Sequence, residues 1–177
     1  MQRISVVGSS GAGKTSLARV ISARLGIPRI ELDAIYWGPE WTHLDDEEFG
    51  VEVADAVAGD TWIVDGNYSS TPVQEIIWGR ADTVVWLDLP RRVVTWRVLR
   101  RSVQRAATGE QMWAGNTERW SNLVKWQPED NIVRWSWTRF HPTREKYAAR
   151  MSDQRWKHLT FVMLRSRTEV AQFLEQR

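Results

Sequence analysis

The sequence of 177 residues contains no cysteine, which excludes a disulfide framework and any thiolate metal site. Its three histidines, at positions 43, 141 and 158, lack the close spacing of a metal site. No apolar run approaches the roughly 18 residues that suggest a membrane span. The first seven residues lead directly into a glycine-rich loop, without the apolar stretch of a secretion signal. We therefore expect one soluble, cytoplasmic domain that makes no contact with a membrane.

The charge of the sequence is nearly balanced but unevenly placed. Its 24 basic residues, most of them arginine, face 22 acids. Acids gather between residues 40 and 55, whereas six arginines occur between residues 91 and 105 without an acid. Such a basic segment predicts an anionic ligand. Nucleic acid and a bound triphosphate would both satisfy it, so charge alone does not choose between them.

Short apolar runs alternate with segments of helical spacing along most of the chain. The run at 83–87 is continuously apolar after its first residue, which is typical of a strand covered on both faces in a parallel sheet. Strands are predicted at 3–7, 29–33, 62–65, 83–87 and 158–164, and helices at 14–25, 47–58, 91–106, 131–151 and 168–176. This alternation predicts one α/β domain over residues 1–177, with three layers and a five-stranded, mostly parallel sheet. Residues 107–130 break the pattern and predict an insertion within that domain.

One motif determines the expected chemistry. Residues 8–15, GSSGAGKT, match the pattern G-x-x-x-x-G-K-[ST], follow a predicted strand and open a predicted helix. Glycines let consecutive backbone N–H groups turn inward, and the start of the helix adds partial positive charge toward the same anion. A chance glycine turn is the alternative, which the agreement of strand, spacing and helix disfavours. The sequence thus predicts a P-loop NTPase fold whose nucleotide-binding residues include Gly8, Ser9, Ser10, Gly11, Ala12, Gly13, Lys14, Thr15 and Ser16.

Two carboxylates at predicted strand ends are candidates for the same site. Lys14 is placed to neutralise the β and γ phosphates, and the Thr15 hydroxyl to coordinate the Mg²⁺ that bridges them. Asp65 closes the apolar run at 62–64 and would hold the water shell of that metal, although Asp-Gly is also a common turn signal. The following Gly66 permits close approach of the backbone to a ligand. Asp33 is predicted to contact a second substrate or act as a base, with a helix-cap role as the alternative.

The sequence resembles the adenylate-kinase-related family of small P-loop kinases, and within it the group labelled DNA topology modulation proteins. The resemblance spans nearly the whole chain and rests on the loop at 8–15, LDAIYW at 32–37, WIVDGNY at 62–68 and ADTVVWLD at 81–88. It implies ATP as a ligand with Mg²⁺, a helical lid at about 107–130, and arginines at four-residue spacing on the helix after the fourth strand.

Several arginines match what the family implies. Arg97 and Arg101 have the expected spacing and share one helical face with Arg105, which would clamp the phosphates; a solvated surface face is the alternative. The lid would draw its other cations from Arg134, Arg139 and Arg144. Arg165 follows the last predicted strand, where the family places the adenine, and a surface arginine is the alternative there.

Two departures from the family concern the phosphoryl acceptor. Adenylate kinases follow the Asp-Gly turn with an arginine that grips the acceptor monophosphate, whereas residues 67–70 here are NYSS. Residues 35–46 also lack arginine and lysine, which disfavours a nucleoside monophosphate acceptor. Tyr36, Trp37 and Trp41 would suit stacking on a neutral ring, with core packing as the alternative. The predicted acceptor contacts are Asp33, Trp37, Gly66 and Asn67.

The leading hypothesis is an ATP-dependent phosphotransferase acting on a small molecule, nucleoside or nucleotide, with Lys14, Asp33, Arg97 and Arg101 as catalytic residues. The alternative is a regulatory ATP-binding protein or ATPase that contacts DNA and affects its topology. It is disfavoured because the triphosphate needs the same arginines and because the sequence shows no DNA-reading module. A nucleotide-binding module without catalysis stays open, and the sequence predicts neither the acceptor nor the oligomeric state.

Overall fold

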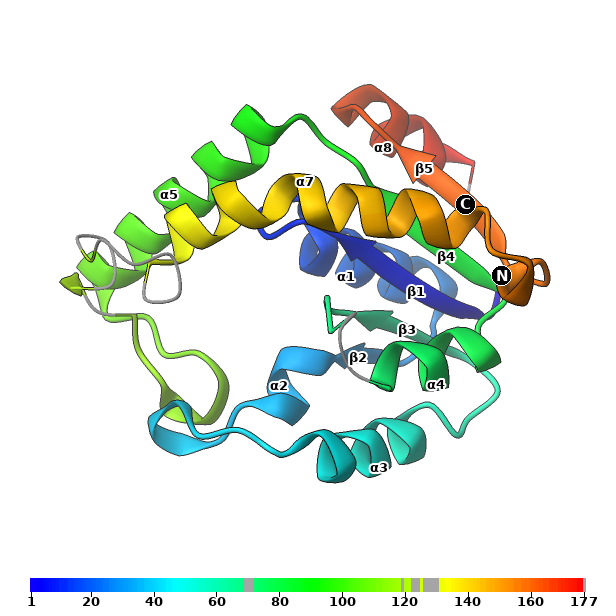
Figure 1. Cartoon of the computed structure of the whole chain (residues 1–177), viewed down its shortest axis with the longest axis horizontal. Coiled ribbons are helices and arrows are strands. Elements are labelled where there is room, and N and C mark those ends of the chain that lie inside the picture. The colour runs from blue at the N-terminus through cyan, green and yellow to red at the C-terminus, as the bar shows by residue number, and fades with distance from the viewer. Residues whose placement is uncertain (69–71, 119, 122–124, 126–130, 177) are drawn as a thin grey trace.

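Five parallel strands form the centre of the protein (Figure 1). The computed structural model describes residues 1–68, 72–118, 120–121, 125 and 131–176. The strands are β1 (Arg3–Gly8), β2 (Arg29–Glu31), β3 (Trp62–Asp65), β4 (Thr83–Leu87) and β5 (Thr160–Leu164), in the spatial order β2-β3-β1-β4-β5. Every pairing between them is parallel, which confirms the predicted five-stranded sheet.

Helices cover both faces of this sheet and give it the predicted three layers. They are α1 (Lys14–Leu25), α2 (Leu32–Tyr36), α3 (Asp46–Ala56), α4 (Val73–Arg80), α5 (Arg91–Thr108), α7 (Ile132–Met151) and α8 (Arg167–Glu175). Successive side chains of a strand point to opposite faces, and β1 shows the result. Val6 belongs to the core that includes Leu17 of α1, whereas Val7 belongs to the core that includes Phe49 of α3 and Trp78 of α4.

The second strand is shorter than predicted, which corrects the placement of Asp33. The strand β2 lies at the edge of the sheet and pairs only with β3, and its last pair joins Glu31 to Asp65. Because β3 ends at Asp65, the residues after Glu31 have no strand to pair with among the described residues, and they form α2 instead. Asp33 therefore lies in the first turn of a short helix and not at the end of a strand.

Besides α2, the helix α4 was not predicted. The helix α4 has only eight residues and begins directly after Pro72. Four of the eight side chains are buried, including Ile77 and Trp78, so the helix has no clear polar stripe from which a period could be read. The other predicted elements are present with ends shifted by about two residues or fewer, which is ordinary for boundaries.

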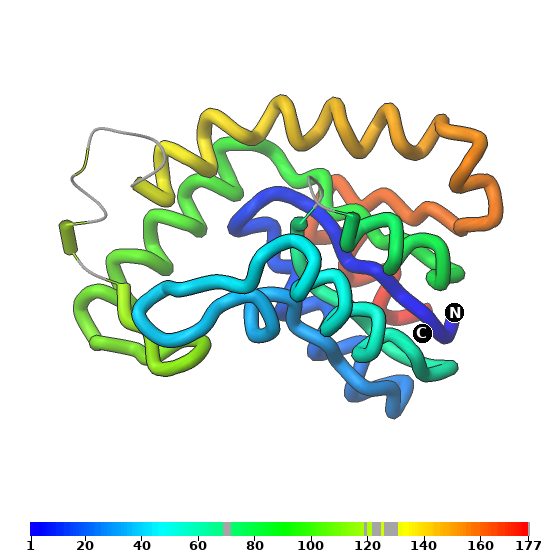
Figure 2. Tube along the Cα trace, turned by 60° about the horizontal axis from the view of Figure 1, so that its bottom comes forward, coloured from blue at the N-terminus to red at the C-terminus, as the bar shows by residue number. Residues whose placement is uncertain are grey.

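Two short loops meet beyond α2 and α5. One contains the 3₁₀ turn η1 (Pro39–Trp41) between the bridged residues Trp37 and His43. The other contains η2 (Trp113–Gly115) between Gln111 and Thr117. The two turns contact each other, as the adjoining blue and yellow-green segments in Figure 2 show. Residues 119, 122–124 and 126–130 of the predicted insertion lie outside the described residues.

The longest helices, α5 and α7, pack along each other beside the sheet (Figures 1 and 2). Asn131 caps the start of α7 by accepting hydrogen bonds from the backbone N–H groups of Val133 and Arg134. Within the part of the chain that the structure describes, neither of these helices nor any other is long and apolar enough to cross a bilayer.

Candidate active site

The glycine-rich loop joins the central strand β1 to α1. Gly11 has a φ of +79°, and a Cβ atom added there would lie 2.4 Å from the carbonyl oxygen of Val94 in α5. A Cβ atom at Gly8 would lie 2.6 Å from the carbonyl oxygen of Leu87 in β4. Both glycines are therefore required by close packing, and this packing fixes the loop between the sheet and α5.

Lys14 lies across this loop. Its Nζ donates hydrogen bonds to the carbonyl oxygens of Gly8, at 3.0 Å, and Ser9, at 3.3 Å. Burial lowers the pKa of Lys14, while Asp33 and Asp65 act in the opposite direction. The ammonium is thus partly desolvated and contacts neutral carbonyl oxygens, and an anion in the loop would compensate its charge.

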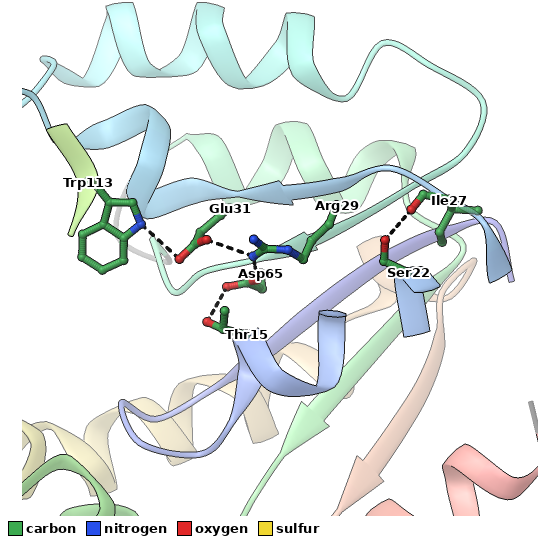
Figure 3. A network of polar contacts seen from close by, with 7 residues as sticks. All are labelled: Thr15, Ser22, Ile27, Arg29, Glu31, Asp65 and Trp113. Atoms are coloured by element: carbon green, nitrogen blue, oxygen red, sulfur yellow. Dashed lines mark hydrogen bonds and ion pairs between the residues drawn. The ribbon is translucent and has the colours of Figure 1, made fainter. Parts of the chain in front are cut away.

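A chain of polar contacts joins the loop to β2 and β3 (Figure 3). The Thr15 hydroxyl donates to Oδ1 of Asp65 at 3.0 Å, and Nη1 of Arg29 donates to Oδ2 of the same carboxylate at 3.0 Å. Arg29 Nη1 also donates to Glu31 at 2.9 Å, and the indole Nε1 of Trp113 donates to the other oxygen of Glu31 at 3.1 Å. Asp65 is 3% exposed. Burial and the charge of Glu31 raise its pKa, whereas the bonds from Arg29 and Thr15 lower it.

The residues at this point fit Mg²⁺ bound together with a nucleotide. Thr15 and Asp65 offer two adjacent oxygens, and Mg²⁺ in such sites uses one or two protein oxygens plus phosphates and water. Among the described residues, no group of three His, Cys, Asp or Glu side chains forms a metal cage. A metal at Thr15 and Asp65 would therefore depend on the phosphates for most of its ligands.

Two of the three arginines predicted to clamp the phosphates reach the loop. Arg97 Nη1 donates to the carbonyl oxygen of Ala12 at 3.1 Å, and Arg101 Nη2 approaches the Ser10 hydroxyl at 3.4 Å. Arg105 instead pairs with Glu110, with 3.7 Å between Nε and Oε1. Since α5 packs against the loop near Val94, the arginines that contact the loop come from the turns that follow Val94, and Arg105 lies farther along the helix.

Asp33 is joined to an aromatic cluster. Its Oδ1 accepts a hydrogen bond of 2.5 Å from the Tyr68 hydroxyl. Burial, followed by the charge of Asp33, raises the pKa of Tyr68, so the hydroxyl stays protonated and able to donate. The cluster around this pair consists of Tyr36, Trp37, Trp41, His43, Phe49 and Tyr68. Tyr68 was given no role from the sequence. The signal that could have pointed to it is that residues 67–70, NYSS, follow the Asp-Gly turn where adenylate kinases have an arginine.

The remaining predicted acceptor residues have structural partners. Gly66 is buried against Leu32, where a Cβ atom would lie 2.6 Å from two of its side-chain atoms, so packing accounts for this glycine. Asn67 accepts a hydrogen bond from the hydroxyl of Tyr147 in α7. The predicted role of Trp37 stays a prediction; its ring packs edge-on against Tyr36 and Trp41.

The peripheral arginines lie apart from the loop contacts described above. Arg144 pairs with the buried Asp88, with 3.0 Å between Nε and Oδ1, and Arg139 is exposed. Arg165 is exposed before α8, and its backbone N–H donates to the Glu169 carboxylate. Their roles toward a nucleotide stay predictions, as does that of Arg134.

A parallel sheet in the order 2-3-1-4-5, with the glycine-rich loop leaving its central strand, defines a P-loop fold. No protein-family model matches the chain, and no curated protein sequence matches it significantly. Solved structures do match.

Three solved kinase structures illustrate this likeness. A shikimate kinase from Acinetobacter baumannii in complex with shikimate gives a TM-score of 0.61 at 14% identity, covering 99% of this chain and 90% of that one. A gluconokinase from Sinorhizobium meliloti 1021 gives 0.52 at 18% identity, covering 99% and 94%. A sugar kinase from Janibacter sp. HTCC2649 gives 0.52 at 17%, covering 99% and 91%. At these identities the likeness establishes the fold, while the finer resemblance to DNA topology modulation proteins stays a prediction.

Proposed function

We propose that the protein is an ATP-dependent phosphotransferase that acts on a hydroxyl group of a small acceptor lacking a phosphate. The observation that carries the proposal is the placement of opposite charges around one loop. Lys14, Arg97 and Arg101 contact the loop at 8–13, whereas the Asp33 carboxylate, whose charge acts on Lys14, is hydrogen-bonded to Tyr68 of the aromatic cluster. Such an arrangement suits a triphosphate tail at the loop and a proton-bearing nucleophile at Asp33.

Each residue has one role in the proposed reaction. Lys14, Arg97 and Arg101 bind the phosphate oxygens and offset the negative charge that develops during transfer. Thr15 and Asp65 would hold Mg²⁺, which supplies further charge neutralisation when bound. Asp33 accepts the proton of the attacking hydroxyl. The acceptor oxygen forms a bond to the γ-phosphorus, the bond from that phosphorus to the β–γ bridging oxygen breaks, and ADP leaves with the electron pair.

The acceptor side supports a hydroxylated molecule over a phosphorylated one. Residues 35–46 contain no arginine or lysine, and Arg29 is already paired with two carboxylates. Asp33 and the aromatic rings offer a carboxylate for hydroxyl groups and faces for a ring. The solved kinases of similar fold include proteins named for shikimate, gluconate and sugars, and these names are consistent with such an acceptor.

The proposal is tested by measuring ADP release from Mg-ATP against a panel of sugars, hydroxy acids, nucleosides and nucleoside monophosphates. One hydroxylated acceptor should accelerate ADP release, and Lys14→Ala should lower the accelerated rate by about 100-fold or more. Lys157→Ala is the matched control, because Lys157 is exposed and far along the chain from the loop. Absence of Mg-ATP binding, or full acceleration by a nucleoside monophosphate alone, contradicts the proposal.

The alternative of a DNA-contacting ATP-binding protein keeps one specific observation in its favour. Arg92 and Arg100 are exposed on α5, and Trp96 between them is 64% exposed. Arginines beside an exposed aromatic ring are typical of surfaces that bind single-stranded nucleic acid. Binding of single-stranded and duplex DNA, measured across salt concentrations, separates the two functions, because phosphate contacts give a steep salt dependence.

A further inference from the structure

We infer that Trp113, in the segment after α5, is a positioning residue for the magnesium-binding oxygens of Thr15 and Asp65. The inference rests on the proposed function, because it concerns the metal that accompanies the nucleotide. Trp113 is 98 residues from Thr15 in the sequence, yet Figure 3 shows its indole at one end of the chain of contacts that ends at the Thr15 hydroxyl.

The connection depends on a single shared nitrogen. Arg29 Nη1 donates both to Glu31, at 2.9 Å, and to Asp65, at 3.0 Å. Any rotation of the Glu31 carboxylate therefore changes the bond from Arg29 to Asp65. Trp113 donates to the other oxygen of Glu31, at 3.1 Å, and so restricts that rotation.

The shared Arg29 nitrogen matters because both of its partners are carboxylates. Two carboxylates compete for one guanidinium, and the side chains of Glu31 and Asp65 are only 19% and 4% exposed. In such a setting each added hydrogen-bond donor offsets part of a carboxylate's lost hydration. The Trp113 indole supplies that donor to Glu31, which leaves more of the Arg29 interaction to Asp65. Asp65 in turn keeps its Oδ1 directed at Thr15.

A separate residue holds the segment in place, so the Trp113 side chain can be tested alone. The Asn116 side chain is 5% exposed. It donates to the carbonyl oxygens of Gly38 and Trp113 and accepts from the backbone N–H of Trp41. These bonds fasten the loop at 111–117 to the loop at 37–43 without using the indole of Trp113.

The test compares Mg²⁺-dependent and Mg²⁺-independent ATP binding by titration calorimetry. Trp113→Phe keeps an aromatic ring, smaller than the indole, and removes the N–H donor. It should raise the dissociation constant for ATP in Mg²⁺ about three- to tenfold, the scale of a weakened charge-assisted hydrogen bond. ATP affinity in EDTA and the melting temperature should change little. Trp120→Phe is the matched control, since Trp120 belongs to the same stretch and is 52% exposed; it should leave all three quantities unchanged.

A second variant identifies the route. In a Glu31→Gln background, Trp113→Phe should change Mg²⁺-dependent ATP binding less than about twofold, because contacting residues in one network are not additive. The inference is overturned if the effect of Trp113→Phe is equal with and without Mg²⁺, or is undiminished in the Glu31→Gln background. If the wild-type protein fails to bind Mg-ATP, the proposed function is refuted as well. If wild type binds Mg-ATP and Trp113→Phe shows the same Mg²⁺ dependence as wild type, this inference alone is refuted.

Discussion

The hydrogen bond between Tyr68 and Asp33 offers a direct test of the acceptor side of the site. Tyr68→Phe removes the hydroxyl that donates to Asp33 at 2.5 Å and keeps the ring within the aromatic cluster. The carboxylate then loses the partner that fixes one of its oxygens. We expect it to rotate away from the orientation in which its other oxygen can accept a proton from the acceptor.

The size of the effect follows from the bond and its surroundings. A hydrogen bond to a charged group contributes about 1.5–3 kcal/mol to stability. Both residues are partly exposed, so water can replace the hydroxyl, and we expect the lower end, about 1.5 kcal/mol. For a domain of this size, that loss lowers the melting temperature by about 3–6 °C. A similar loss in the transition state lowers kcat/KM for the acceptor about tenfold.

The assay separates this effect from a general loss of structure. Thermal unfolding, ATP binding and acceptor-dependent ADP release are measured for wild type, Tyr68→Phe and Tyr36→Phe. Tyr36→Phe is the matched control because Tyr36 packs in the same cluster, with 4.8 Å between its ring centroid and that of Tyr68. The reasoning is refuted if Tyr68→Phe leaves kcat/KM unchanged, or if it weakens ATP binding as much as it weakens turnover.

The same residue predicts a dependence on high pH. Burial and Asp33 raise the pKa of Tyr68 in the folded protein above its unfolded value of about 10. The folded state therefore favours the neutral phenol, and this contribution is fully present below about pH 10 and declines as the pH rises further. Denaturant titrations between about pH 9 and pH 11 should show a steeper loss of unfolding free energy in wild type than in Tyr68→Phe. Parallel curves for the two proteins would contradict the assignment.

Two further substitutions test packing and charge elsewhere. Gly11→Ala should cost about 3 kcal/mol or more, because its Cβ atom would lie 2.4 Å from a backbone carbonyl oxygen of α5; Gly26→Ala, at a φ of +66° with nothing within 4 Å, should cost only about 1 kcal/mol in the same denaturant titration. Arg144→Ala should cost about 1–2 kcal/mol because it leaves the buried Asp88 carboxylate without this partner, discounted for the exposure of Arg144. The exposed Arg139→Ala on the same helix is its control, and an equal cost for both would refute the role of the ion pair.

The parts of the fold that were predicted correctly are those with local signals. The glycine-rich loop is a contiguous pattern, and the strands β1, β3 and β4 are short apolar runs buried on both faces. The first two residues of α2 were predicted as the end of a strand, and the helix itself was missed, because its five residues are too few to show a period. Its place is decided by where the neighbouring strand β3 stops, which no local pattern records.

The residues of the candidate site also differ in whether a local signal in the sequence points to them. The motif singles out Lys14 and Thr15, and the family resemblance together with helical spacing singles out Arg97 and Arg101, although Arg105 shares that spacing and pairs with Glu110 instead. Arg29, Glu31 and Trp113 could not be predicted, since their contacts join residues as far as 82 positions apart. Each is an ordinary residue in its local sequence, and only the meeting of β2, β3 and the loop at 111–117 gives it a role.

The segment from α5 to η2 therefore contacts two parts of the candidate site, the glycine-rich loop and the carboxylates beside Thr15. Its first part carries Arg97 and Arg101 to the glycine-rich loop, and its last part carries Trp113 to the carboxylates beside Thr15. Since one continuous segment makes both sets of contacts, a displacement of that segment would loosen the phosphate contacts and the metal-side oxygens together. Binding of a triphosphate, which is attracted by the arginines, would by the same connection favour the arrangement that directs Asp65 toward the proposed Mg²⁺ position. The affinities for nucleotide and Mg²⁺ should then be coupled through this segment, beyond the direct contact of the ion with the phosphates.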